Sequence, residues 1–130
     1  MYQDTIKNFF KLPKNSFPKF DLIVLGVGED GHIASLFPSR QELKTKNKLV
    51  LPIPKFGRNN EERVSLTLPV INHAKNIMFV VAGKKKASVV KRVFESKNKR
   101  RDSSLPAAKV KPHNGNLIWF LDKEAAAYVV

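Results

Sequence analysis

The stretch FDLIVLGVGEDGH at residues 20–32 decides the fold class of this chain. Residues 20–25 form a largely apolar run of strand length, which is typical of a β-strand that is covered on both faces of a sheet. A glycine-rich loop follows at the carboxyl end of this strand, where ligands bind in open α/β sheets. We therefore expect the loop to face a ligand, with Gly26, Gly28 and Gly31 letting the backbone approach the substrate. We also expect a short helix that runs on to Pro38, with His32 near its N-terminus.

Segments on either side of this stretch alternate between strands and helices. Further strands are predicted at residues 49–53, 63–68, 76–82 and 117–121, and helices at residues 3–11, 69–75, 83–96 and after residue 122. In the 83–96 helix, Ala87, Val90 and Phe94 recur on one face, which predicts a side that packs on the core. Trp119 and Phe120 are also expected in the core. Buried strands separated by helices imply a Rossmann-like α/β fold, with a mainly parallel sheet flanked by helices.

The composition excludes several classes of protein. The chain has 130 residues, no cysteine and a formal net charge of +13. Without cysteine it forms no disulfide, thiolate zinc site, iron–sulfur cluster or cysteine nucleophile. No apolar run approaches the roughly 18 residues that a transmembrane helix needs, so we expect a soluble, cytoplasmic protein without membrane contact.

The positive charge is concentrated in one segment. Residues 84–101 carry nine basic residues and one acidic residue, which leaves a local charge of +8. Lysine and arginine suit phosphate backbones, but this cluster lacks the interleaved aromatic residues of single-strand binders. We therefore expect no nucleic-acid partner, and a basic nucleic-acid module is the lesser alternative.

Gly26, Gly28 and Gly31 also fit the G-x-G-x-x-G spacing of dinucleotide-binding folds. That interpretation requires an acidic residue about 20 positions later, at the end of the next strand. Here the 49–53 strand ends among prolines with no carboxylate nearby, and Pro38 interrupts the expected crossover helix. A nicotinamide or flavin cofactor is therefore disfavoured.

His32 is the strongest candidate for chemistry in the loop. A histidine that titrates near neutral pH can accept a proton from water, and Asp30 is close enough in sequence to orient it or balance its charge. A surface histidine with an incidental acidic neighbour is an equally good interpretation of these two residues alone. We expect His73 to be structural and His113 to be a turn residue.

Five segments together resemble the 6-phosphogluconolactonase family and occur in the family's order. They span about residues 20–128 and comprise residues 26–38 (GVGEDGHIASLFP), 63–69 (RVSLTLP), 83–87 (GKKKA), 105–108 (LPAA) and 112–122 (PHNGNLIWFLD). The resemblance implies a hydrolase that converts 6-phospho-D-glucono-1,5-lactone to 6-phosphogluconate in the oxidative pentose phosphate pathway. It implies no metal and no organic cofactor, and a small phosphosugar lactone as the binding partner.

The same resemblance implies roles for individual residues. His32 matches the family's catalytic histidine, which activates water, and Asp30 matches the acidic position that supports it. Lys86 matches a lysine that binds the substrate phosphate, and a lysine beside free helix N–H groups suits a dianionic phosphate. Arg63 matches a recurrent family position and suits phosphate or carboxylate, although a structural ion pair explains it nearly as well.

The related aminosugar-phosphate isomerases share the fold and the Asp-Gly-His core of this loop. They place a glutamate five residues after the histidine to help with proton transfer, whereas this chain has Phe37 there. Isomerase activity is therefore the lesser alternative to lactone hydrolysis.

Members of the family are considerably longer than this chain, which begins shortly before their glycine–histidine loop. We therefore expect residues 1–130 to be a single partial domain, the C-terminal half of such a fold, without an early glycine-rich phosphate loop or a substrate-binding arginine. A fragment is favoured over a half completed by another chain and over a shortened, non-catalytic relative that acts in binding. An uncovered half sheet predicts poor solubility or self-association.

Overall fold

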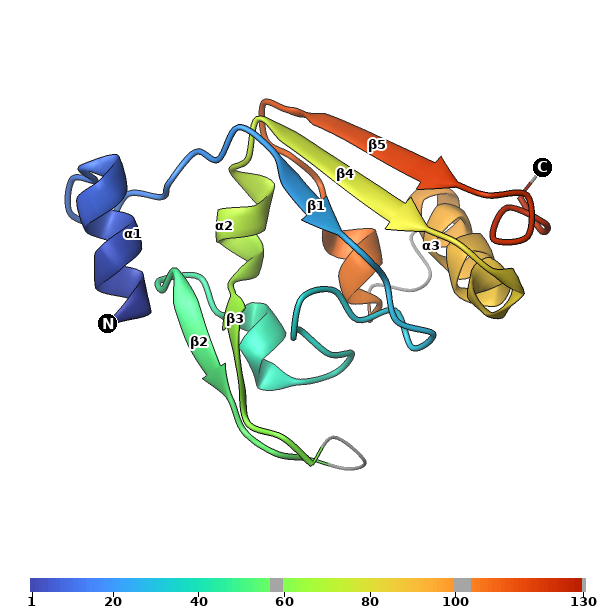
Figure 1. Ribbon diagram of the computed structural model, residues 1–130, viewed down its shortest axis with the longest axis horizontal. Coiled ribbons are helices and arrows are strands. Elements are labelled where there is room, and N and C mark those ends of the chain that lie inside the picture. The colour runs from blue at the N-terminus through green and yellow to red at the C-terminus, as the bar shows by residue number, and fades with distance from the viewer. Residues whose placement is uncertain (57–59, 100–103, 130) are drawn as a thin grey trace.

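The computed structural model describes residues 1–56, 60–99 and 104–129 (Figure 1). The helices, with η marking a 3-10 helix, are α1 (Tyr2–Phe10), η1 (Gln41–Lys44), α2 (Leu68–Asn72), η2 (Lys84–Lys86), α3 (Ala87–Lys99) and η3 (Pro106–Lys109). The strands are β1 (Ile23–Leu25), β2 (Val50–Ile53), β3 (Arg63–Leu66), β4 (Asn76–Val81) and β5 (Asn116–Leu121). They form a sheet of order β1-β4-β5 and a separate pair, β2 with β3.

The three-stranded sheet is parallel throughout and confirms the expected α/β architecture. Ile23 of β1 lies opposite Ile77 of β4, and Phe79 of β4 lies opposite Trp119 of β5. Parallel neighbours require long crossover connections, and here α3 and η3 lie between β4 and β5 in the sequence. The carboxyl ends of all three strands therefore meet at one edge, from which the 26–32 loop leaves β1 (Figure 1).

The strand expected at residues 63–68 forms, but outside the parallel sheet. β3 pairs antiparallel with β2, with Arg63 opposite Ile53 and Leu66 opposite Val50. The two strands are close neighbours in sequence, and antiparallel pairing needs only a short connection between them. The closeness of β2 and β3 in the sequence therefore explains why β3 pairs with β2.

One face of the parallel sheet forms the core. Ile77, Phe79 and Val81 on β4 are each at most 3% exposed. They pack in one cluster with valines of α3, which lies along this side of the sheet (Figure 1). The predicted apolar stripe of that helix is confirmed, because Ala87 and Val90 are buried and Phe94 packs against the cluster.

The opposite face is exposed, so the expectation that β1 is covered on both faces is wrong for this structure. Val24 is 57% exposed, Val80 53% and Phe120 53%. Phe120 therefore lies outside the core, whereas the neighbouring Trp119 stacks on Phe79 with ring centroids 3.9 Å apart. We call the exposed apolar side of this sheet the outer face; it comprises Leu22, Val24, Met78, Val80, Ile118 and Phe120.

Residues 26–40 contain no helix, which corrects the expected helix after His32. The Leu36 N–H donates to the Ile33 carbonyl at 2.8 Å, and the Ile33 N–H donates back to the Leu36 carbonyl at 3.3 Å. Ala34 between them has a φ of 50°, a left-handed conformation that a right-handed helix does not contain. A tight turn therefore replaces the helix, and His32 has no helix N-terminus beside it.

The C-terminal helix expected after Asp122 is also absent from the described residues, which form turns from 123 to 129. The capping role of Asp122 nevertheless appears, because its carboxylate accepts the Ala125 N–H at 2.7 Å. The same carboxylate accepts the Gly83 N–H at 3.1 Å. Asp122 thus ties the end of β5 to the turn that precedes α3.

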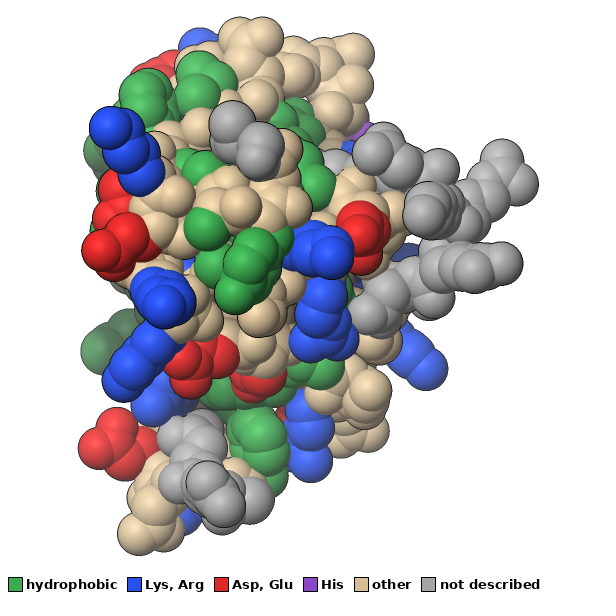
Figure 2. Space-filling view, turned by 90° about the vertical axis from the view of Figure 1, so that its right-hand side faces the viewer, with side chains coloured by type: hydrophobic (Ala, Val, Ile, Leu, Met, Phe, Trp, Pro, Cys, Tyr) green, Lys and Arg blue, Asp and Glu red, His purple; other side chains and the backbone are tan. Residues whose placement is uncertain are grey.

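Charged side chains of both signs are interspersed on the side of the molecule shown in Figure 2, with hydrophobic side chains exposed between them. α3 extends to Lys99, beyond its expected end at residue 96. Arg100 and Arg101 of the basic 84–101 segment lie outside the described residues. In the described parts of the chain, no helix is both long and apolar enough to cross a bilayer.

Candidate active site

The loop after β1 folds back on itself at Gly28. The Gly28 N–H donates to the His32 carbonyl at 3.0 Å, and the Gly28 carbonyl accepts the Gly31 N–H at 2.9 Å. A Cβ added to Gly28 would lie 2.1 Å from His32 Nδ1 and 2.7 Å from Asp30 Oδ1. Glycine is therefore required here, because the imidazole packs directly on the backbone of residue 28.

Gly31 is required for a different reason. Its φ is +92°, and an added Cβ would lie 2.6 Å from Leu105 Cδ2. The Gly31 carbonyl accepts the Ala107 N–H at 3.1 Å. Residues around η3 therefore brace the loop from a distant part of the sequence.

Gly26 differs from the other two loop glycines. It lines the cavity beside His32, but an added Cβ would meet no heavy atom within 4 Å. Nothing in the described structure therefore requires glycine at this position.

His32 and Asp30 form the central contact of the loop. His32 Nδ1 lies 2.6 Å from Asp30 Oδ1, and the His32 backbone N–H donates to the same oxygen at 3.0 Å. An ionised carboxylate only accepts hydrogen bonds, so the proton of a neutral imidazole belongs on Nδ1. Nε2 then carries the lone pair, and in the described structure it has no hydrogen-bond partner.

Two opposing effects set the pKa of the Asp30 carboxyl. Partial burial raises it, while the hydrogen bonds from the His32 backbone and ring, together with the charge of the ring, lower it. The net effect is a pKa below the usual value of 3.8. Asp30 is therefore ionised at neutral pH and able to hold the Nδ1 proton of His32.

Phe37 packs against the His32 ring, with centroids 4.6 Å apart. Phe56 meets Phe37 edge-on at 4.8 Å, and the Arg40 guanidinium lies 4.3 Å from the centre of the Phe56 ring. In the sequence, Phe37 stood out only because the related isomerases have a glutamate at this position, and no contact of Phe37 with His32 was predicted. Its spacing of five residues from His32 gave no sign that the tight turn at residues 33–36 would bring the two rings together.

Lys86 reaches the same loop from the other side. Its ammonium group donates to the Val27 carbonyl at 2.7 Å. Val27, His32 and Lys86 line a cavity of about 400 Å³ at the carboxyl end of β1, together with Val24 of the outer face. The structure thus brings together the histidine and the lysine that the sequence singled out.

Lys86 does not sit at an open helix N-terminus, which differs from the expectation. Lys84–Lys86 form a 3-10 turn, and the backbone N–H of Lys86 donates to the Gly83 carbonyl at 3.1 Å. The side chain of Lys86 is half-buried, whereas Lys84 and Lys85 are exposed. The cavity therefore gains an ammonium group rather than a set of free helix N–H groups.

Arg63 is not among the residues that line this cavity. It lies at the start of β3 in the other sheet, and its guanidinium is 4.0 Å from the Glu61 carboxylate. The structural ion pair that the sequence left open is present, at the outer limit of such contacts.

The other two described histidines lie away from this site. His73 Nδ1 is 2.6 Å from the Pro69 carbonyl, and its ring stacks on Phe17 at 4.7 Å. His113 packs edge-on against His73 at 4.8 Å, and its backbone N–H donates to Asn72. Neither histidine lines the His32 cavity.

The chemistry available at the site is that of a positioned base. Asp30 holds one imidazole nitrogen, the other is free to accept a proton, and the Lys86 side chain lines the same cavity. Among the described residues, no group of three or more His, Cys, Asp or Glu side chains is placed to share a metal ion.

Comparisons with known proteins place this site in context. A family model described as glucosamine-6-phosphate isomerases/6-phosphogluconolactonase matches residues 1–119. A human protein named 6-phosphogluconolactonase is 48% identical over 112 residues, which are 86% of this chain and 42% of the human protein. The chain therefore spans about two fifths of the length of the curated relatives that it matches first.

Solved structures agree with this comparison. The crystal structure of a devB protein superposes with a TM-score of 0.83 at 33% identity, covering 99% of this chain and 52% of that one. A 6-phosphogluconolactonase from Trypanosoma brucei superposes with a TM-score of 0.82 at 26% identity, covering 99% of this chain and 51% of the other. The parallel sheet and its helices therefore match a fold that, in those proteins, includes about as much polypeptide again.

Proposed function

Because the chain belongs to the glucosamine-6-phosphate isomerase/6-phosphogluconolactonase family, we propose that it carries the catalytic half of a 6-phosphogluconolactonase. The proposed reaction is hydrolysis of 6-phospho-D-glucono-1,5-lactone to 6-phosphogluconate, in the cytoplasm and without a metal or organic cofactor. The observation that carries this proposal is the 2.6 Å contact between His32 Nδ1 and Asp30 Oδ1 at the edge of a cavity.

In the proposed mechanism His32 acts as a general base. Nε2 takes a proton from a water molecule while the water oxygen attacks the lactone carbonyl carbon. The bond between that carbon and the ring oxygen then breaks, and the ring oxygen takes the proton back from the imidazolium. Asp30 is a positioning residue that keeps the Nδ1 proton in place and balances the transient positive charge.

We assign the substrate phosphate to Lys86. An ammonium group has three N–H donors, and one of them is used by the Val27 carbonyl. The remaining donors and the positive charge suit a phosphate dianion, and a cavity of about 400 Å³ has room for a phosphosugar. Gly26 and Gly28 line this cavity, whereas Gly31, which was expected to bind substrate with them, does not. Arg63 stays outside this proposed set because it does not reach the cavity of this chain.

The outer face supports the further proposal that this site is completed by more polypeptide. Val24, Val80 and Phe120 expose apolar side chains on it, and Val24 also lines the His32 cavity. A layer packed on the outer face would therefore also form a wall of the cavity. We propose the N-terminal half of the same domain as that layer, with self-association of the bare face when it is absent.

Isomerase activity is the second candidate, and Phe37 argues against it. A proton shuttle five residues after His32 needs an ionisable group, whereas Phe37 packs its ring against the imidazole at 4.6 Å. A non-catalytic binding role is the third, and it predicts that removing the imidazole leaves the chain's function unchanged.

Lactonase activity is tested by comparing the chain with a domain in which it is joined to a relative's N-terminal half. The lactone opens spontaneously, so the rate is read as acceleration above that background. We expect acceleration in the completed domain, its loss in His32→Ala, and no change in the matched control His113→Ala, whose ring contacts His73 outside the site. A completed, folded domain without acceleration would overturn the assignment, and equal activity in His32→Ala would overturn the mechanism.

A further inference from the structure

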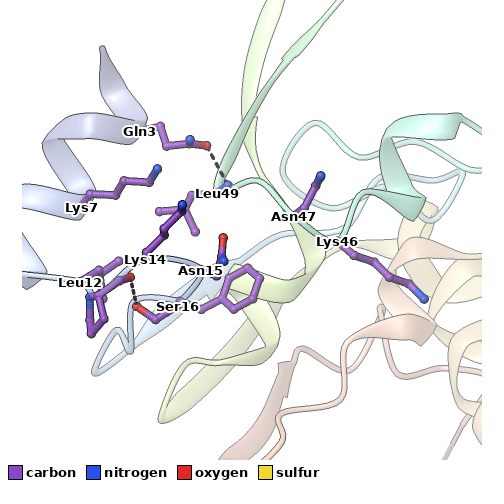
Figure 3. A pocket seen from close by; sticks show the side chains of 11 residues that line it. Gln3, Lys7, Leu12, Lys14, Asn15, Ser16, Lys46, Asn47 and Leu49 are labelled. Atoms are coloured by element: carbon purple, nitrogen blue, oxygen red, sulfur yellow. Dashed lines mark hydrogen bonds between the residues drawn. The ribbon is translucent and has the colours of Figure 1, made fainter.

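A second basic hollow lies between α1 and the segment that leads into β2 (Figure 3). It has a volume of about 380 Å³ and shares no lining residue with the His32 cavity. Lys7, Lys14 and Lys46 line it, and no aspartate or glutamate does. We propose that this hollow binds a small phosphate dianion, as inorganic phosphate or as the phosphomonoester group of a metabolite.

Gln3 supplies donors whose direction is fixed by the backbone. Its Oε1 accepts the Leu49 N–H at 2.9 Å and the Val50 N–H at 3.2 Å. Because both partners are donors, only the amide oxygen can face them, which settles the orientation of the side chain. The Nε2 group has no hydrogen-bond partner among the described residues, so its two N–H donors remain available at the hollow.

Two lysines converge on the same space. Figure 3 shows the ends of Lys7 and Lys14 pointing into the gap beside Gln3, while Lys46 points away from it. Neither Lys7 nor Lys14 forms an ion pair with a carboxylate in the described structure. The two ammonium groups repel each other when they share one hollow, and a bound dianion offsets this repulsion because it attracts both of them.

The backbone holds Lys14 in this position through two consecutive turns. α1 ends at Phe10 and is capped by Lys11, whose φ is 51°, and the Leu12 N–H donates to the Lys7 carbonyl at 3.0 Å. The chain then reverses at Pro13, whose carbonyl accepts the Ser16 hydroxyl at 2.7 Å. This reversal carries Lys14 back over the last turn of the helix.

The charge of the proposed ligand follows from the donors. Two ammonium groups and an amide suit a group with several acceptor oxygens and two negative charges, which describes a phosphomonoester near neutral pH. A monocarboxylate offers fewer acceptors and half the charge, so it binds more weakly. Leu49, which is 4% exposed, lines the hollow as an apolar surface.

The test is a titration of the full chain with inorganic phosphate at constant ionic strength, followed by ¹H–¹⁵N NMR. We expect saturable shifts at the side-chain amide of Gln3 and the backbone amide of Asn15. The double variant Lys7→Gln/Lys14→Gln should weaken binding about tenfold or more. Gln3→Glu keeps an oxygen for the Leu49 and Val50 N–H groups but replaces the free donors with a negative charge, so it should abolish the shift at the Asn15 amide.

Lys111→Gln/Lys123→Gln is the matched control, because it removes the same charge at exposed lysines that do not line the hollow. It should retain the affinity of the unaltered chain. Equal weakening in this control would show diffuse attraction to a basic protein and overturn the site. Shifts confined to Gly28 and His32 would place the phosphate in the other cavity, and the absence of saturation would exclude binding altogether. The first outcome would overturn this second site while agreeing with the phosphate position proposed at Lys86, and the second would leave the proposed lactonase activity untouched.

Discussion

Replacing Gly28 with alanine tests the central geometry of the active-site proposal without removing any catalytic group. The new Cβ would stand 2.1 Å from His32 Nδ1, whereas ordinary contact begins at 3.4 Å. The ring must therefore move by the difference, about 1.3 Å, and Asp30 Oδ1 at 2.7 Å must also shift. A movement of that size breaks a hydrogen bond that is now 2.6 Å long. Because a misplacement of about 1 Å costs roughly 100-fold in rate, we expect a loss on that order.

Two measurements check this prediction. Long-range ¹H–¹⁵N NMR of the chain reports which imidazole nitrogen of His32 carries the proton, and it should show a defined Nδ1–H form that Gly28→Ala loses. Lactone hydrolysis above the spontaneous rate, measured on the completed domain, should fall in parallel. Gly26→Ala is the matched control, because its Cβ meets nothing within 4 Å, and it should change neither readout.

The result that would refute this reasoning is a Gly28→Ala protein with an unchanged Nδ1–H signature and an unchanged rate. Such a protein would show that the imidazole does not rest on residue 28. A loss of activity in both glycine variants would instead point to a general effect on the loop. Thermal unfolding separates these cases from misfolding, because a variant that keeps its fold still unfolds in one cooperative transition.

Four further predictions concern charge, substrate binding and packing. The pKa of Asp30 is lower in the folded state than its usual value of 3.8, so the ionised carboxylate stabilises the fold at neutral pH, and this stabilisation is lost as the pH falls through the folded-state pKa. Asp30→Asn should therefore reduce the loss of stability below pH 3.8, measured as the free energy of unfolding in denaturant at a series of pH values. Lys86→Met should raise KM for the phosphorylated lactone by about tenfold or more and leave the Nδ1–H signature of His32 intact. Phe79→Ala should cost about 3–5 kcal/mol in the free energy of unfolding, because the ring is fully buried against Trp119. Phe120→Ser should change the free energy of unfolding by less than about 1 kcal/mol and reduce self-association in sedimentation experiments, because the ring is 53% exposed.

The strands of the parallel sheet could be predicted because their signal is local. Residues 76–82 and 117–121 are apolar runs between turn residues, and they became β4 and β5. The α3 helix followed from the spacing of its apolar residues in the same way. The partner of β3 could not be predicted, because its alternating pattern fits an antiparallel pair as well as an edge of the main sheet.

The error over the loop after His32 has a physical cause. Residues 33–37 have the composition of a short buried helix, but Ile33 and Leu36 are both fully buried through a tight turn instead. The turn needs Ala34 in a left-handed conformation. The intrinsic preference of alanine is for a right-handed helix, but burial of the neighbouring side chains can outweigh that preference. The contacts that bury Ile33 and Leu36 come from other parts of the chain, so the local sequence could not predict the turn.

In the candidate site, too, contacts between residues close in sequence could be predicted and contacts between distant residues could not. The contact of His32 with Asp30 joins residues two apart, so their pairing was visible in the sequence. The contact of Lys86 with the Val27 carbonyl joins residues 59 apart and was not predicted, because the sequence and the family resemblance pointed Lys86 only toward the substrate phosphate. Phe37, Leu105 and Ala107 carry no chemistry that a sequence pattern would mark, although each contacts the loop.

The outer face and the His32 cavity adjoin each other, because Val24 belongs to both. The strand register places Asn76 and Asn116 on the same side as the apolar residues of the outer face, and none of the residues of β1, β4 and β5 is charged. Strands with one solvated face normally alternate apolar residues toward the core with polar residues toward water, and open edges usually carry charge. The outer face therefore has the character of a surface that packs against polypeptide. Because Val24 lies both on this face and in the cavity lining, a layer packed on the face would also contact the cavity, and any effect of that layer on substrate binding would be matched by an equal effect of substrate on its packing.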